Sequence, residues 1–284
     1  MNKPVTQQGY GIRIERVIRH IWDHLDQPLD LLALADVAAL SPFHFHRVYR
    51  GFTGETVADT IRRLRLHRGA GDLVQGSAPI AAVARRAGYG SVAAFSRAFR
   101  AGYGTTPAAY RASGRLVQPA SPSPKKESSM YDVSIVTMEP VRLAGLRHTG
   151  SYMDIGRAFD RLYALAGARG LMTPTTRGVG VYYDDPAAKP EKELVSDACI
   201  SVPVGALLPD ELRVIDLAGG RYAVLHHLGP YAELEKAYAW LYRDWLPASG
   251  AEPANRPIFE EYLNNPRELP PAQWRTDVCL PLNP

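Results

Sequence analysis

Hydrophobic positions follow a helical period as far as about residue 112, and short alternating stretches typical of strands begin at residue 131. Between these regions, residues 113–129 lose the periodicity and become rich in proline, serine and lysine, which is typical of a linker. We therefore predict a helical domain over residues 1–115, a linker over 116–129 and a second domain over 130–284. The predicted fold class is α+β, with an all-α first domain.

The helical half repeats itself. Residues 31–40 overlay residues 80–89, and from Ser41 onward each residue overlays the one 50 positions later. Each copy predicts a short helix, a tight turn and a second helix, over 42–51 and 92–100. Serine followed by proline, as in Ser41-Pro42, is a strong signal for a helix start. Helix-turn-helix proteins use this arrangement to place the second helix in a DNA major groove.

The second helix of each copy has an inward and an outward face. Phe45, Val48 and Tyr49 form the inward stripe in the first copy, and Phe95, Ala98 and Phe99 form it in the second. An outward arginine can read guanine or hold a phosphate, whereas valine and alanine offer only apolar contact. A solvated surface is the alternative for any single arginine, and repetition at a fixed offset favours DNA contact. The outward candidates are His44, His46, Arg47 and Arg50, then Val92, Ala93, Ser96, Arg97 and Arg100.

Charge divides the chain at the same place. Residues 1–129 carry a net charge of +9 and residues 130–284 a net charge of −5, which together make the total of +4. A basic domain joined to an acidic one favours one module that binds a polyanion and one with another task. Chance variation between two surfaces is the alternative.

The residues of the helical half resemble a known family. The matching stretches are residues 28–31 and 41–50 in the first copy, then 84–89, 95–100 and 104–111. Over residues 10–112 the chain resembles the DNA-binding domain of the AraC/XylS family. The resemblance implies base-facing positions at Phe43, His46, Arg47, Val92, Ala93, Ser96 and Arg97. Because Val92 and Ala93 stand where polar side chains are frequent, Arg97 is the main hydrogen-bonding candidate of the second helix.

The C-terminal half also repeats itself. Residues 142–163 overlay residues 221–242, and residues 182–186 overlay 262–266. Each unit predicts a strand, a helix and two strands, so we expect a duplicated βαββ domain with pseudo-two-fold symmetry and one antiparallel sheet. The helices bury Ile155, Phe159, Leu162 and Ala166 in one unit and Leu234, Tyr238, Leu241 and Trp245 in the other. Cys199 overlays Cys279, which indicates two core positions and not a redox pair.

One difference between the repeats suggests a binding site. Glu260 stands where the first unit has Gly180, and strand alternation places it on the same face as Tyr262. A groove between related halves is a usual place for a small ligand, and a carboxylate among aromatic rings suits a cationic or polar aromatic one. The alternative is a glutamate at the rim, as we expect for Glu261.

The C-terminal half resembles the GyrI-like effector-binding domains. The resemblance rests on residues 141–150, 178–186, 217–231, 245–250 and 259–264. It implies a central groove for bulky, often cationic aromatic compounds, with Glu260 at the family's glutamate position. Some GyrI-like proteins act as hydrolases on electrophilic compounds. The candidate ligand-binding residues are Glu260, Tyr262, Tyr182, Trp240, Tyr152, Tyr231 and, ranked lower because it also fits the core stripe, Trp245.

These patterns predict a transcription regulator that senses a small molecule. No Ser-His-Asp signature and no metal-ligand spacing is evident, and His148 and His227 sit at equivalent strand ends, so we expect no enzyme activity, cofactor or metal. The alternatives are a GyrI-like hydrolase or drug-sequestering domain fused to a DNA-binding module, and a constitutive DNA binder whose second half only dimerises. We expect a cytoplasmic monomer or homodimer without signal peptide or membrane span. Its expected partners are double-stranded DNA and an effector, with RNA polymerase as a further candidate.

Overall fold

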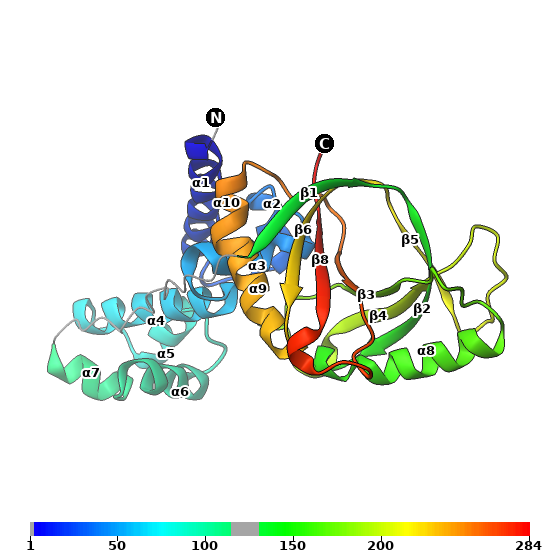
Figure 1. The fold of residues 1–284 in the computed structure, drawn as a ribbon. Helices are drawn as coiled ribbons and strands as arrows, with labels where there is room; N and C mark the ends of the chain where they lie inside the picture. Colours follow the sequence, from blue (N-terminus) through cyan, green and yellow to red (C-terminus); the bar gives the residue numbers. More distant parts are fainter. Residues whose placement is uncertain (1–2, 115–130) are drawn as a thin grey trace.

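The computed structural model describes residues 3–114 and 131–284, so the predicted linker over 116–129 lies outside the described residues. A helical N-terminal half and an antiparallel-sheet C-terminal half confirm the predicted fold class (Figure 1). No helix among the described residues is long and apolar enough to span a bilayer.

The helical half contains the two predicted helix-turn-helix units, α2–α3 and α5–α6. Ser41 accepts a hydrogen bond from the amide of Phe43 at the start of α3, directly before Pro42. Helices α3 and α6 each extend beyond the predicted end and stop where Gly54 and Gly104 adopt positive φ. The helices are α1 (Lys3–Asp23), α2 (Leu31–Val37), α3 (Pro42–Thr53), α4 (Val57–Gln75), α5 (Ile80–Arg86), α6 (Val92–Tyr103) and α7 (Pro107–Ser113).

The C-terminal half is built on one sheet of eight antiparallel strands, in the order β1-β6-β8-β7-β3-β4-β2-β5. Helix α8 (Gly156–Ala168) packs on strands β2 and β4, and α9 (Leu234–Trp240) packs against β6. A π-helical segment, η4 (Leu241–Trp245), and α10 (Leu246–Ser249) continue α9. The strands are β1 (Asp132–Met138), β2 (Val141–Thr149), β3 (Gly178–Tyr182), β4 (Val195–Ser201), β5 (Arg213–Leu217), β6 (Gly220–Leu228), β7 (Ile258–Tyr262) and β8 (Arg275–Pro281).

The two repeats meet where β3 pairs with β7, and the strand that precedes each repeat pairs with a strand of the other repeat. Strand β1 precedes the first unit but pairs with β6 of the second, while β5 precedes the second unit and pairs with β2 of the first. The predicted βαββ unit therefore has an additional leading strand, which in each case closes the far edge of the other half of the sheet. Cys199 and Cys279 are buried at equivalent positions of β4 and β8, and both are free thiols.

The helix of the second repeat departs from regular α geometry. Its predicted core stripe ended at Trp245, but the π turn over Leu241–Trp245 adds about one residue to the turn and rotates the next residues about the helix axis. Leu246 is therefore fully buried, whereas Trp245 is only partly buried. The matching helix of the first repeat stays regular and buries all four predicted residues.

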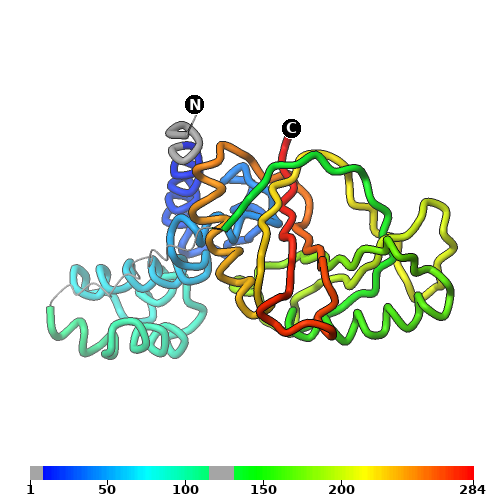
Figure 2. The backbone as a smooth tube through the Cα atoms, viewed as in Figure 1, coloured from blue at the N-terminus to red at the C-terminus, as the bar shows by residue number. Residues whose placement is uncertain are grey.

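The two halves of the protein pack against each other. Helix α1 lies beside α10, and α3 contacts η4 and α9 (Figures 1 and 2). One hydrophobic core therefore runs from the helical half into the sheet domain. The Tyr10 hydroxyl donates to the carbonyl of Ala251 at 3.1 Å, and Arg13 forms an ion pair with Glu252. Figure 2 also shows that α4–α7 extend away from the sheet.

Candidate functional site

Gly180 and Glu260 face each other at the centre of the sheet. They are equivalent residues of the two repeats, and they are direct partners in the β3–β7 pairing. Equivalent residues pair with each other only where the pseudo-two-fold axis crosses the sheet, so the axis passes between these two. Tyr182 and Tyr262 share this face of the sheet, which α8 and α9 cover.

Three tyrosines form a hydrogen-bond network around the Glu260 carboxylate, which is only 5% exposed. The hydroxyl of Tyr238 donates to Oε1 at 2.9 Å, and the hydroxyl of Tyr262 donates to Oε2 at 3.0 Å. The Tyr182 and Tyr262 oxygens are 2.6 Å apart. Because the one Tyr262 proton is already used on Glu260, Tyr182 is the donor of this last bond.

Gly180 leaves the space that the network needs. A Cβ at this position would lie 2.8 Å from the Tyr262 hydroxyl and 2.9 Å from the Tyr182 hydroxyl. Any side chain at residue 180 would therefore push the two phenols apart. The break in repeat symmetry thus has two halves: one unit contributes the carboxylate and the other contributes the space around it.

The network sets the protonation of the site. Burial raises the pKa of Glu260, while hydrogen bonds from the three tyrosines and the positive charge of Arg47 oppose this increase. Burial and the nearby Glu260 carboxylate raise the pKa of Tyr238 and Tyr262 well above the usual value for tyrosine. The phenols therefore stay protonated as donors, and Glu260 is the group whose negative charge burial disfavours. A cation placed here would stabilise that charge.

A cavity of about 1360 Å³ opens onto this network. Glu260 and four of the predicted aromatic residues line it, namely Tyr152, Tyr182, Tyr231 and Tyr262. Trp240 and Trp245 do not line it: Trp240 packs on Tyr131 with ring centroids 5.5 Å apart, and Trp245 packs against the hydrophobic core. Side chains that were not predicted to bind the ligand also line it, including Tyr163 and two residues of the predicted core stripes, Tyr238 and Phe159.

Helix α3 closes part of the same cavity. Arg47, Arg50, Gly51 and Gly54 line it, although all four belong to the helical half. The Arg47 guanidinium lies 5.1 Å from the ring centroid of Tyr238 and 5.8 Å from that of Tyr242. Its Nη2 donates to the carbonyl of Asp184 at 2.9 Å. The predicted DNA-reading arginine of the first unit is therefore inserted into the sheet domain.

His44 fixes the same helix face. Predicted as outward, it is fully buried against the sheet domain. Nε2 lies 3.1 Å from the Ala254 carbonyl, which can only accept, so Nε2 carries the proton and donates. Nδ1 therefore accepts from the Tyr242 hydroxyl at 2.7 Å. Burial, and secondarily the charge of Arg47, lowers the pKa of His44 to about 3, so the ring is neutral.

The remaining DNA candidates have different surroundings. Phe43 and His46 are partly buried, and Arg50 is exposed within 3.7 Å of Glu235. In the second unit, Val92, Ala93, Arg97 and Arg100 are exposed and Ser96 is partly buried. The inward stripes agree with the predicted pattern, except that Ala98 is only partly buried.

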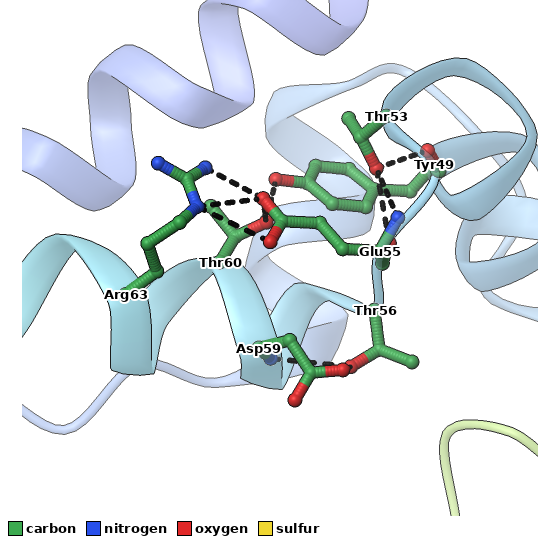
Figure 3. Close-up of polar contacts among 7 residues, drawn as sticks. All are labelled: Tyr49, Thr53, Glu55, Thr56, Asp59, Thr60 and Arg63. Atoms are coloured by element: carbon green, nitrogen blue, oxygen red, sulfur yellow. Dashed lines mark hydrogen bonds and ion pairs between the residues drawn. The ribbon is translucent and has the colours of Figure 1, made fainter. Parts of the chain in front are cut away.

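A polar cluster beneath α3 holds this helix to α4 (Figure 3). The Tyr49 hydroxyl donates to Thr60 Oγ1, which in turn donates to Glu55, each at 2.8 Å. Arg63 reaches both carboxylate oxygens of Glu55, with a shortest distance of 2.6 Å. This ion pair, in which Glu55 is nearly buried, fixes the α3–α4 connection to α4, and the Tyr49–Thr60 bond joins the two helices themselves.

Other residues singled out from the sequence have structural surroundings. His148 and His227 each place Nε2 near a backbone carbonyl three residues ahead, as their symmetry suggested. Glu261 pairs with Arg177 and stays partly exposed. No group of three or more potential metal ligands occurs within residues 3–114 and 131–284.

Comparisons with known proteins match each half separately. Residues 131–283 match the GyrI-like small molecule binding domain, and residues 34–113 match a helix-turn-helix domain. The chain is 30% identical over 156 residues to the probable transcriptional regulator YgiV of Escherichia coli K12, covering 53% of this chain and 96% of that protein. It is 37% identical over 98 residues to the regulatory protein SoxS of the same strain, covering 34% and 92%.

A solved structure of a hydrolase from Listeria innocua is similar to the sheet domain. Sequence identity is 14% with a TM-score of 0.42, covering 53% of this chain and 91% of that one. Similarity at this level supports no conclusion about activity.

Proposed function

Because this chain belongs to the GyrI-like small-molecule-binding family and carries an AraC-type helix-turn-helix domain, we propose that it regulates transcription in response to a bulky aromatic cation bound beside Glu260. The coarser function, that of an AraC-type transcription regulator with a GyrI-like domain, follows from the family matches together with YgiV and SoxS. The class of effector and the residues that bind it are the proposal.

The observation that carries the proposal is a buried carboxylate at the end of an aromatic cavity. Glu260 accepts its hydrogen bonds from neutral phenols in a poorly solvated place, and its pKa stays raised although the charge of Arg47 acts against this. A cation near the rings of Tyr182 and Tyr262 would be attracted both by the charge of the Glu260 carboxylate and by the aromatic faces. The volume of about 1360 Å³ accommodates an effector of several fused or linked rings.

For DNA, we propose that the outward residues of α3 and α6 contact bases and phosphates. The exposed set on α6, with Arg97 at its centre, supports this for the second unit. In the first unit, Arg47 has the equivalent place on α3. The excess positive charge of residues 1–129 supports a phosphate contribution to affinity.

The test compares a cation with an uncharged molecule of the same shape. Naphthylmethyl-trimethylammonium and its carbon isostere neopentylnaphthalene differ only in the charged nitrogen. We expect the full-length protein to bind the cation more tightly, and Glu260→Gln to remove most of that preference while keeping the affinity for the isostere. Calorimetric titration measures both. Glu261→Gln is the matched control, since Glu261 pairs with Arg177 on the other face of the same strand.

Equal affinities of wild type and Glu260→Gln for the cation would remove Glu260 from the site. The hydrolase alternative has its own readout with the same protein, because turnover of an electrophilic naphthyl ester would release a naphthol that absorbs and fluoresces. We expect no turnover above that of the buffer.

A further inference from the structure

We infer that Arg47 competes from within the chain with the effector's cation for the aromatic wall beside Glu260, so that a cationic effector and the docked form of α3 exclude each other. The inference rests on the proposed function, because it concerns the ligand-free form of the protein, in which Arg47 lies in the cavity that the effector would enter. In that docked state the DNA-reading face of the first helix-turn-helix unit is covered. Effector binding then uncovers it.

The geometry around Tyr238 links the two sites directly. Its hydroxyl donates to Glu260 at 2.9 Å, while its ring lies 5.1 Å from the Arg47 guanidinium. Tyr238 therefore contacts the Glu260 carboxylate through its hydroxyl and the Arg47 cation through its ring. Aromatic faces bind guanidinium and quaternary ammonium groups by the same electrostatic attraction, so Arg47 is an internal competitor for the effector.

A second wall of the cavity also reaches Arg47. Tyr152 lies edge-on to Tyr182 with centroids 4.8 Å apart, and its hydroxyl accepts from the amide of Asp184 at 3.0 Å. The carbonyl of the same Asp184 accepts the Arg47 hydrogen bond. A ligand that moves Tyr152 therefore moves the acceptor that holds Arg47 in place.

Docking of α3 is built into residues where the two helix-turn-helix copies differ. His44, which is buried against the sheet domain, corresponds to Ala94, and Gly51 corresponds to Ala101. A Cβ on Gly51 would lie 3.1 Å from Cα of Arg243 and 3.2 Å from its nitrogen, both backbone atoms. Among the described residues, the buried histidine and the close approach belong to the first copy, whose helix α3 packs against η4 and α9 of the sheet domain.

Removal of Arg47 should strengthen cation binding. We expect Arg47→Ala and Arg47→Met to raise the affinity for naphthylmethyl-trimethylammonium by about tenfold, which is the gain when about a tenth of wild-type molecules are open to the ligand. Arg47→Met keeps the apolar stem and so guards against a collapsed cavity. Calorimetry on the full-length protein measures the change, with neopentylnaphthalene as the uncharged comparison.

Arg50→Ala is the charge control. Arg50 also lines the cavity, but it is exposed and lies near Glu235, so its removal changes the net charge of the cavity wall while Arg47 stays over the Tyr238 ring. We expect a smaller gain than for Arg47→Ala. Equal gains for both variants, or an unchanged or weaker cation affinity without Arg47, would overturn the inference.

Chemical labelling measures directly whether Arg47 on α3 is accessible. Phenylglyoxal modifies accessible arginines, and mass spectrometry reads each site, with exposed Arg97 as the internal standard. We expect slow labelling of Arg47 in the free protein and faster labelling when the cation is bound. Slower labelling with the cation would mean that the ligand is enclosed beneath a docked α3, which contradicts displacement.

The two hypotheses fail in different ways. If the cation binds wild type and Glu260→Gln equally, or not at all, the proposed effector class is wrong. If Glu260→Gln weakens the cation but the Arg47 variants do not strengthen it, the effector site stands and the internal competitor is wrong.

Discussion

Helix α3 of the first helix-turn-helix unit lies against the sheet domain, whereas helix α6 of the second keeps its outward residues exposed apart from Ser96, which is partly buried. Both helices have a serine N-cap, an aromatic core stripe and a C-terminal glycine with positive φ. Their equivalent arginines nevertheless have opposite surroundings: Arg47 lies over two tyrosine rings and Arg97 is exposed. The fold of the unit therefore does not decide its availability to DNA.

This contrast indicates how a duplicated binding module can be regulated through one copy alone. Residues common to both copies build the module, and residues that differ, such as His44 and Gly51, attach one copy to the sheet domain. Under the proposed displacement, we expect the second unit to hold DNA weakly while the first is covered, and both units to bind DNA only after release.

Substitution of Gly51 should have the largest effect on the contrast between α3 and α6. A valine side chain at this position would meet the Arg243 backbone, which has little freedom to move, so Gly51→Val should shift α3 toward the undocked form on the order of a hundredfold, the upper range for overpacking. Faster phenylglyoxal labelling of Arg47 would report this. Ala101→Val is the control, because Ala101 is exposed at the same helix position of the second copy. Unchanged Arg47 labelling in Gly51→Val would contradict the close packing.

Acid should release the first unit and not the second. The pKa of His44 is lowered to about 3 in the docked state, against an ordinary value near 6.5. Neutral His44 therefore contributes its full stabilisation to the docked form above about pH 6.5. As pH falls toward 3 this stabilisation is lost, by about 2 kcal/mol at pH 5, or roughly thirtyfold in the docking equilibrium.

The measurement is the ratio of Arg47 to Arg97 labelling between pH 7 and pH 5, which cancels the pH dependence of the reagent. Besides Tyr242 and the Ala254 carbonyl, Arg47 faces His44 and favours the neutral ring. His44→Asn, which offers a donor and an acceptor that do not titrate in this range, should flatten the profile. A wild-type ratio that stays constant would exclude His44 as the cause.

DNA recognition should depend unequally on the two arginines. In the ligand-free protein we expect Arg97→Ala to reduce the preference for a selected duplex over random DNA by about tenfold, within the range of one lost bidentate base contact. Arg47→Ala should have a smaller effect on that preference there, since its helix is covered. In a Gly51→Val background the two losses should become similar. Fluorescence anisotropy at constant salt measures them, and equal losses in the unmodified protein would contradict selective covering of α3.

Much of the architecture is predictable because repeats and periodicity are local. The two helix-turn-helix copies, the duplicated sheet domain and the equivalence of Gly180 and Glu260 all follow from overlaying the sequence on itself, whereas the direct pairing of these two residues is seen only in the structure. Trp245 packs against the core as its stripe predicts but is only partly buried, because the π turn there has no signature in a 3.6-residue period. Tyr238 was assigned to the core because it falls on the helical period of the buried stripe, although its hydroxyl donates to Glu260.

Docking of the two halves was not predicted, because periodicity describes each half separately and an outward polar residue looks solvent-exposed until a second domain covers it. His44 shows this well: its helix position faces outward, and only contact with Tyr242 and Ala254 buries it. A usable signal existed in the unequal positions His44/Ala94 and Gly51/Ala101.

The exchange of leading strands has a consequence for how the sheet domain forms. Strand β1 is the first strand to be synthesised, yet its partner β6 follows only after the entire first repeat. Likewise, the outer edge of β2 is unpaired until β5 has been synthesised. Contacts so distant along the chain slow folding. A chain truncated after the first repeat would retain β1 without a partner and a central strand β3 with an open edge, which is a template for aggregation. Each half of the sheet therefore takes its edge strand from the chain segment that leads into the other half.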